Sequence, residues 1–132
     1  IALDLSQYMY IAQDNVARSN GQIGNFDTAQ QDLIDYTSSV MSIRDNYDSL
    51  WNGERENLFV DDVVYIDLKT SDNNQMIYGF TISDTIQTIT LDADSIIGTQ
   101  VRNLLTDEVF VIVDGQITIT IDALSAGFFL VE

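Results

Sequence analysis

The chain has 132 residues, of which 45% are hydrophobic and 20% are charged, so it is long enough for one domain with a real core and too short for several. Five Lys and Arg residues stand against 21 Asp and Glu residues, which gives a formal net charge of −16 and a pI near 4.1. A chain with this negative charge repels nucleic-acid phosphates and anionic lipid headgroups, so neither nucleic acid nor a membrane is expected as a partner.

The residue types that are missing narrow the chemistry further. The sequence contains no Cys and no His, which excludes disulfides, zinc–thiolate clusters, imidazole bases and the usual catalytic triads. No window approaches the roughly 18 consecutive apolar residues of a membrane-spanning helix. The acidic surface suits salty or extracellular conditions, so an extracellular or secreted location is expected. The first residue is Ile1 rather than Met, which predicts a processed product or the end of a longer chain.

Residues 1–26 fit two structures. The apolar positions from Leu5 to Val16 follow helical spacing, but residues 8–11 also fit a short buried strand. Residues 20–25 hold two Gly and two Asn, which predicts a loop with positive-φ turns. Both interpretations of the first segment stay open.

The clearest helix is predicted from Thr28 to about Asn46. Its apolar residues are spaced three and four apart and form one stripe: Leu33, Tyr36, Val40, Ile43 and Tyr47. Polar residues occupy the opposite face, so this helix must lie against a partner surface. Thr28 followed three residues later by Gln31 predicts a capping box, in which each side chain satisfies an amide at the start of the helix.

The second half of the chain changes to short runs rich in Val, Ile, Thr, Tyr and Phe that alternate with polar residues. About seven strands are predicted, at residues 58–69, 75–82, 85–91, 98–104, 108–113, 116–121 and 126–131. This number and spacing indicate a β-sandwich, so the predicted fold class is α+β, with a helical part followed by a mainly antiparallel sandwich. Asp114 and Gly115 predict a two-residue type I′ hairpin turn. The Ile residues at 117, 119 and 121 then share a core face.

Pairs of acids invite comparison with glycoside hydrolysis, which needs two carboxyl groups roughly 5–10 Å apart. The candidates are Asp61 with Asp62 and Glu54 with Glu56. In a chain with 21 acidic residues such pairs arise by chance, so solvated residues are the favoured interpretation. Asp92 and Asp94 resemble the start of a calcium loop, but the Gly and Glu that complete such a loop are missing, so a polar turn is favoured.

Exposed aromatic rings can stack on sugar rings. The candidates are Tyr47, Trp51, Tyr65, Tyr78 and Phe80. Core packing is favoured for those on a periodic apolar face. Trp51 follows the predicted helix and stands near Gly53, and two interpretations stay open for it. Its ring is either an exposed platform for a sugar or packed between the helix and the sandwich, and packing is favoured.

Four segments, residues 8–14, 32–44, 101–110 and 115–130, carry a family resemblance. In this order they resemble the C-terminal end of the α-amylase family of glycoside hydrolases, in which a (β/α)8 barrel is followed by a Greek-key β-sandwich. Residues 8–14 are similar to the eighth barrel strand and its loop, with Ala and Asp where the family has Gly and Glu. Residues 32–44 resemble the last barrel helix, which ends in Arg as here at Arg44. The other two segments are similar to parts of the family's sandwich.

The resemblance implies a non-catalytic piece of a larger enzyme. Residues 1–56 are then the last strand, loop and helix of the barrel, and residues 57–132 are a Greek-key sandwich that stabilises it. The family's catalytic Asp, Glu and Asp belong to earlier barrel strands, so no catalytic residue and no cofactor is expected in this chain, and calcium would belong to a parent enzyme. The implied partners are the catalytic barrel, in the same or a cleaved chain, and an α-glucan, with Tyr10, Gln13 and Trp51 as candidate carbohydrate contacts.

Two other hypotheses fit the residues. An acidic β-domain with a helical arm also suits a structural or assembly subunit, whose arm covers the apolar surface of a neighbour. The sandwich also suits a carbohydrate-binding module that uses Trp51.

Overall fold

A computed structural model of the protein describes residues 26–132. The chain divides into two compact units, residues 1–37 and residues 38–132. Because the description begins at residue 26, the strand or helix predicted before that residue and the loop predicted at residues 20–25 lie outside the described residues. Within residues 26–132, no helix is both long and apolar enough to cross a lipid bilayer.

Helix α2 (Thr28–Asn46) has the predicted bounds. Its capping box, however, lies one residue earlier than predicted. The amide of Gln30 donates to Asp27 Oδ1 at 2.9 Å, and the amide of Asp27 donates to Gln30 Oε1 at 3.1 Å. The predicted pair of Thr28 and Gln31 is wrong because Asp27 supplies the carboxylate that reaches the free amide of the third helical residue.

A short helix, α3 (Ser49–Asn52), and eight antiparallel strands follow. The strands are β1 (Glu54–Val60), β2 (Val64–Thr70), β3 (Gln75–Thr81), β4 (Gln87–Asp92), β5 (Gln100–Asn103), β6 (Val109–Val111), β7 (Gln116–Ile121) and β8 (Ala126–Val131). The predicted fold class, a helix followed by antiparallel strands in a sandwich-like arrangement of two sheets, is confirmed, with eight strands rather than about seven. β1 crosses the predicted domain boundary between residues 56 and 57, and that boundary stays a prediction.

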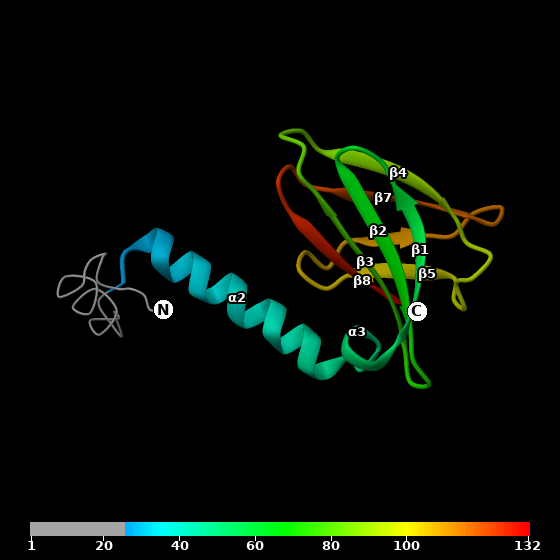
Figure 1. The fold of residues 1–132 in the computed structure, drawn as a ribbon, viewed down its shortest axis with the longest axis horizontal. Helices are drawn as coiled ribbons and strands as arrows, with labels where there is room; N and C mark the ends of the chain where they lie inside the picture. The colour runs from blue at the N-terminus through cyan, green and yellow to red at the C-terminus, as the bar shows by residue number, and fades with distance from the viewer. Residues whose placement is uncertain (1–25) are drawn as a thin grey trace, which may run out of the picture. The chain divides into compact units, whose positions relative to one another are not determined.

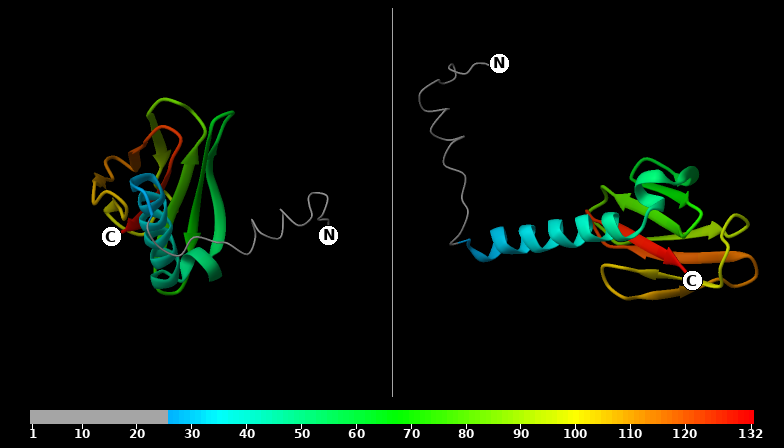
Figure 2. Two further views of the ribbon diagram at one scale, coloured as in Figure 1. Left: turned by 90° about the vertical axis from the view of Figure 1, so that its left-hand side faces the viewer. Right: turned by 90° about the horizontal axis from the view of Figure 1, so that it is seen from below.

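The strands form a six-stranded sheet in the order β1-β2-β3-β8-β5-β6 and a two-stranded sheet of β4 and β7. The ribbon views show β4 and β7 as a separate layer beside the larger sheet (Figures 1 and 2). The chain passes from β3 to β4 in the smaller sheet, returns to the larger sheet for β5 and β6, and passes again to β7 in the smaller sheet. It ends in the larger sheet with β8, which lies between β3 and β5. Strands that are distant in sequence therefore lie side by side.

The main core lies between the two sheets. Its buried side chains come from the inner faces of both layers and from the turn after β4: Val64, Ile66, Leu68, Ile77, Ile89, Leu91, Ala93, Ile96, Val101, Ile117, Ile119, Ile121 and Phe129. The predicted core face of β7 is confirmed, since Ile117, Ile119 and Ile121 are at most 2% exposed. Burial of such side chains, at about 25 cal/mol per Å² of apolar surface, is the main term that stabilises the sandwich.

The predicted strand at residues 58–69 is wrong because the chain turns in the middle of it. β1 ends at Val60 and β2 begins at Val64, and the two strands pair antiparallel. Asp61 holds the turn, since its Oδ1 accepts the amides of Val63 and Val64 at 2.9 and 2.8 Å. The apolar residues of β1 and β2 look like one strand in the sequence. Only this turn, which is held by hydrogen bonds from the backbone to a side chain, separates the two strands.

Asp114 and Gly115 form the predicted two-residue turn. Their φ angles are 51° and 77°, both left-handed as a type I′ turn requires, and Val113 and Gln116 exchange backbone hydrogen bonds of 2.8 and 3.0 Å across it. The predicted hairpin does not continue beyond that pair. β6 pairs with β5 in the larger sheet and β7 pairs with β4 in the smaller one, so the chain changes layer at this turn.

Gly115→Ala tests the left-handed turn. No atom lies within 4 Å of the position that a Cβ would take, so the cost comes from the backbone at φ +77°. We expect the free energy of unfolding in urea to fall by about 1 kcal/mol. Asp114→Asn is the matched control, because Asn tolerates this region, and it should change stability by less than about 0.5 kcal/mol. Equal stability of Gly115→Ala and the unsubstituted chain would contradict the assigned turn.

Candidate functional site

The end of α2 is anchored on the outer face of the six-stranded sheet. Ile43 is 8% exposed and forms a second buried cluster with Met76 of β3 and Phe128 of β8. Partly buried apolar side chains surround it, among them Val40, Tyr47, Leu50, Tyr78, Leu104, Leu105 and Leu130. Because neighbouring residues of a strand point to opposite faces, Ile77 and Phe129 enter the main core. β3 and β8 are therefore covered on both faces.

The connection from α2 to the sheet depends on a close approach at Gly53. The amide of Gly53 donates to the carbonyl oxygen of Ser49 at 3.0 Å and ends α3. A Cβ on Gly53 would come within 2.4 Å of that oxygen. Only glycine fits here without a shift of the backbone, so this residue allows α3 to lead directly into β1.

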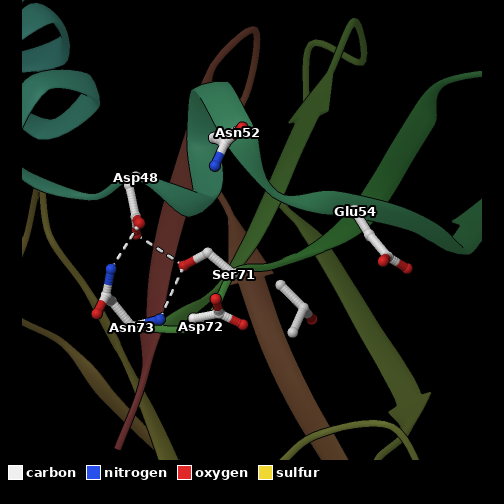
Figure 3. Close-up of a pocket in the computed structure, with 7 residues that line it drawn as sticks. Asp48, Asn52, Glu54, Ser71, Asp72 and Asn73 are labelled. Atoms are coloured by element: carbon white, nitrogen blue, oxygen red, sulfur yellow. Dashed lines mark hydrogen bonds between the residues drawn. The ribbon is translucent and has the colours of Figure 1, made fainter.

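Asp48 lies between the two helices and binds the turn that joins β2 to β3. Its Oδ1 accepts hydrogen bonds from Ser71 Oγ at 2.7 Å and Asn74 Nδ2 at 2.8 Å, and its Oδ2 accepts one from Asn73 Nδ2 at 2.7 Å. Figure 3 shows the carboxylate turned toward Ser71 and Asn73. The bond from Ser71, followed by that from Asn73, holds the pKa of Asp48 below its ordinary value of 3.8. Asp48 is therefore ionised near neutral pH and unsuited to act as a general acid.

Asp48→Asn tests the charge of this carboxylate. Because the folded pKa of Asp48 lies below the unfolded value, its charged form contributes stability that is fully present above pH 3.8 and is lost as the pH falls through the folded pKa. We expect the variant to be less stable than the unsubstituted chain near neutral pH and equally stable in strong acid, as measured by urea unfolding across that range. Asp72→Asn removes a charge from the same turn without touching the three bonds, and controls for net charge. A stability difference that does not vary with pH would contradict the ionised state.

An open polar cleft of about 510 Å³ lies beside Asp48 (Figure 3). It is lined by Asp48, Asn52, Glu54, Thr70, Ser71, Asp72 and Asn73. Three of these side chains are acidic and none is basic. In the part of the chain that the structure describes, no group of three or more His, Cys, Asp or Glu is placed to hold a metal ion. The cleft presents carboxylate, amide and hydroxyl groups that can form hydrogen bonds with a polar ligand.

Of the three predicted carbohydrate contacts, the structure describes one. Trp51 lies on α3 and is 56% exposed. The favoured interpretation, a ring that seals the helix against the sandwich, is therefore wrong, and among the described residues Trp51 is an exposed ring. Tyr10 and Gln13 lie outside those residues. The role of Trp51, Tyr10 and Gln13 as carbohydrate contacts stays a prediction.

The acidic pairs singled out in the sequence lie in turns, on the edge strand β1 and at the end of β4. They are Asp61 with Asp62, Glu54 with Glu56, and Asp92 with Asp94. Ser95 Oγ donates to Glu56 Oε2 at 3.1 Å, and Gln116 Nε2 donates to Asp92 Oδ1 at 3.1 Å. The polar turn predicted after Asp92 is confirmed by the bond from the Ile96 amide to the Ala93 oxygen at 3.0 Å. Asp61, Glu56 and Asp92 therefore form hydrogen bonds that hold turns and strands of the sandwich.

The role of Asp48 has no clear signal in the sequence. It is one of many scattered acids, and its three partners lie 23 to 26 residues further along the chain. The available signal is its position directly after a predicted helix, where a carboxylate can accept hydrogen bonds. That position does not reveal which turn supplies the donors.

Comparison with solved structures relates this chain to α-amylases. AmyP, solved in complexes with maltotriose and with maltose, matches 86% of this chain with 32% identity and a TM-score of 0.76. An Anoxybacillus α-amylase matches 83% of the chain with 25% identity and a TM-score of 0.72. The α-amylase of Geobacillus thermoleovorans matches 81% with 16% identity and a TM-score of 0.73. The predicted resemblance to the C-terminal part of α-amylases is confirmed.

The match covers a limited part of these enzymes. The chain spans 23–24% of the length of the solved chains. In those proteins the corresponding C-terminal domain is attached to a catalytic barrel. No protein-family model and no curated protein sequence matches the chain.

Proposed function

We propose that this chain is the non-catalytic C-terminal part of an α-amylase-like α-glucan hydrolase, and that it stabilises the catalytic barrel. The observation that carries the proposal is the surface of α2. Its exposed large apolar side chains are Leu33, Ile34, Tyr36 and Met41, with exposed fractions of 66%, 37%, 47% and 50%. Apolar side chains of this size on one helix indicate an interface.

The anchored end of α2 supports a stabilising role. Ile43 is buried against Met76 and Phe128, and each such side chain contributes about 1.5–3 kcal/mol when it is removed from water. In AmyP the corresponding domain is attached to a barrel in the same chain. By analogy, α2 takes the place of the last barrel helix, and the sandwich fixes its C-terminal end.

The mass and activity of the native polypeptide test this proposal. We expect a species several-fold heavier than 14.8 kDa, or a co-purifying barrel fragment, that hydrolyses starch. The isolated chain should hydrolyse none. A repeated species of 14.8 kDa would favour a structural or assembly subunit instead, and starch hydrolysis by the isolated chain would contradict the non-catalytic role.

A carbohydrate-binding module is a second candidate, favoured by the exposure of Trp51. Its ring stands on α3, whose last residue, Asn52, lines the polar cleft. An exposed aromatic ring beside hydrogen-bonding groups suits a sugar ring. Retention on an insoluble glucan that is abolished by Trp51→Ala and kept by Tyr36→Ala would support this function. Absence of retention on every glucan tested would remove it.

The proposal extends to the location and cofactors of the parent enzyme. A net charge of −16 suits an extracellular or secreted protein because like charges keep it dispersed. Detection of the native polypeptide in the medium rather than in the cells tests this location. Calcium, if the parent enzyme requires it, is assigned to the barrel.

A further inference from the structure

Three of the basic residues lie in one row across the outer face of the six-stranded sheet. The sequence has five Lys and Arg residues in total. Arg55 of β1 is paired with Lys69 of β2, and Lys69 is paired with Met76 of β3. Met76 is paired with Leu130 of β8, and Leu130 with Arg102 of β5. Directly paired residues share a face, so these cations lie on the face where α2 is anchored.

Two of the cations on this face are neutralised within the chain. Arg55 Nε lies 3.2 Å from Asp67 Oδ2, and Arg102 pairs with Glu132. Lys69 and Arg44, which comes from the last turn of α2, form no ion pair with any residue between 26 and 132. In a chain with 21 acidic residues, two cations that line one groove and have no carboxylate partner among residues 26–132 point to a carboxylate from another molecule.

Arg44 and Lys69 line the same groove, which has a volume of about 290 Å³. Its other lining side chains are apolar: Val40, Leu50, Tyr78 and Phe128. A groove of this size is at the small end of binding sites, with room for one or two side chains. The groove therefore combines an apolar floor with two positive charges that no carboxylate of the described residues pairs with.

We propose that this groove contacts the catalytic barrel and receives an apolar side chain of the barrel whose neighbouring carboxylates pair with Arg44 and Lys69. This inference rests on the proposed function, since it takes the barrel as the occupant. The apolar floor buries the anchoring side chain, as at the centre of protein interfaces. The two cations fix its register through charge complementarity.

Two other occupants fit the groove less well. A second copy of this chain carries the same net charge of −16, and the two copies repel each other. A free phosphate needs several converging donors, whereas four of the six lining side chains are apolar. An apolar group that carries a carboxylate matches both features.

A small mimic of such a group tests the groove in the chain itself. 2-Naphthoate joins an aromatic ring to one carboxylate, and 2-naphthalenemethanol has the same ring without charge. We expect 2-naphthoate to shift the backbone amide signals around the groove in the isotope-labelled chain, and to bind more tightly than the alcohol despite the negative charge of the protein. Raising NaCl from about 20 mM to about 500 mM should weaken the naphthoate several-fold, because salt screens exposed charges.

The double variant Arg44→Gln/Lys69→Gln removes both charges and keeps the groove. We expect naphthoate binding to weaken about tenfold, because each exposed ion pair contributes a factor of about 2 to 5. Binding of the alcohol should not change. Arg55→Gln is the matched control: it removes a cation from the same face, one already paired with Asp67, and should alter naphthoate binding less than about twofold. The single variant Lys69→Gln gives an intermediate loss and supports the result if the double variant is unstable.

Three results would overturn this inference. They are equal binding of the acid and the alcohol, unchanged naphthoate binding in the variants, and self-association of the chain through the groove, which would assign it to a second copy. The mass of the native polypeptide tests the proposed function separately. A heavy, starch-hydrolysing polypeptide together with failed naphthoate binding would keep the barrel as partner and reject this contact.

Discussion

Phe129→Ala is expected to lower the free energy of unfolding by about 3–5 kcal/mol, because it leaves a cavity in the main core. Phe129 is 0% exposed and lies between the two sheets. Its ring meets that of Phe110 edge to face, with centroids 5.8 Å apart and an angle of 70°. Gly127, two residues earlier on β8, lies so close to this ring that an added Cβ would come within 2.4 Å of it. The neighbouring position on this face of the strand therefore has no side chain that could fill the cavity left by Phe129→Ala.

Urea unfolding followed by circular dichroism measures this loss. Phe80→Ala is the matched control, since Phe80 lies on the outer face of β3 and is 37% exposed. It should cost about 1–2 kcal/mol, in proportion to the smaller area that the ring buries. A loss below about 1 kcal/mol in Phe129→Ala would contradict a tightly packed core between the sheets.

Elements with a strong local periodicity are predicted correctly from the sequence. α2 keeps its predicted bounds because its apolar positions repeat every three or four residues and its ends carry polar residues. β7 keeps its predicted bounds and face because Ile alternates with Thr throughout it. Both patterns are contained within the element itself and do not depend on what packs against it.

Elements whose limits depend on a single side chain or on distant pairing are predicted poorly. The turn after Val60 depends on Asp61, which is one acid among 21. Asp114 and Gly115 favour the same two-residue turn whether the strands on either side of it pair with each other or with other strands. The separation of β6 from β7 follows from packing, because Phe110 and Ile112 lie against the main core from the larger sheet, and the local pattern does not indicate that contact.

The candidate site is harder to predict than the fold for the same reason. The carboxylate of Asp48 meets donors 23 to 26 residues away, and Arg44 and Lys69 come to line the same groove only through the packing of α2 on the sheet. The sequence does show that basic residues are rare, with five in 132. It does not show that Arg44 and Lys69 line one groove, because that depends on which face of β2 is covered by a helix.

Ile43→Ala is expected to release the last turns of α2 from the sheet while the sandwich stays folded. Ile43 is the residue of α2 that is buried in the described structure, and it packs with Met76 and Phe128 in a cluster separate from the main core. Removal of its side chain should lower the free energy of local opening by about 2–4 kcal/mol. Hydrogen exchange measures this directly, because amides of residues 40–46 should exchange faster while those of β4 and β7 keep their protection.

Met41→Ala is the matched control for this release. Met41 lies on the same helix, is 50% exposed, and Ala favours the helix at least as well, so exchange in α2 should stay nearly unchanged. Equal protection of residues 40–46 in Ile43→Ala and the unsubstituted chain would show that α2 is held by other contacts. Loss of protection throughout β4 and β7 would show instead that the two clusters unfold as one unit. In the native polypeptide, the proposed function requires that Ile43→Ala also lower the heat stability of starch hydrolysis, because a released helix end no longer connects the barrel to the sandwich.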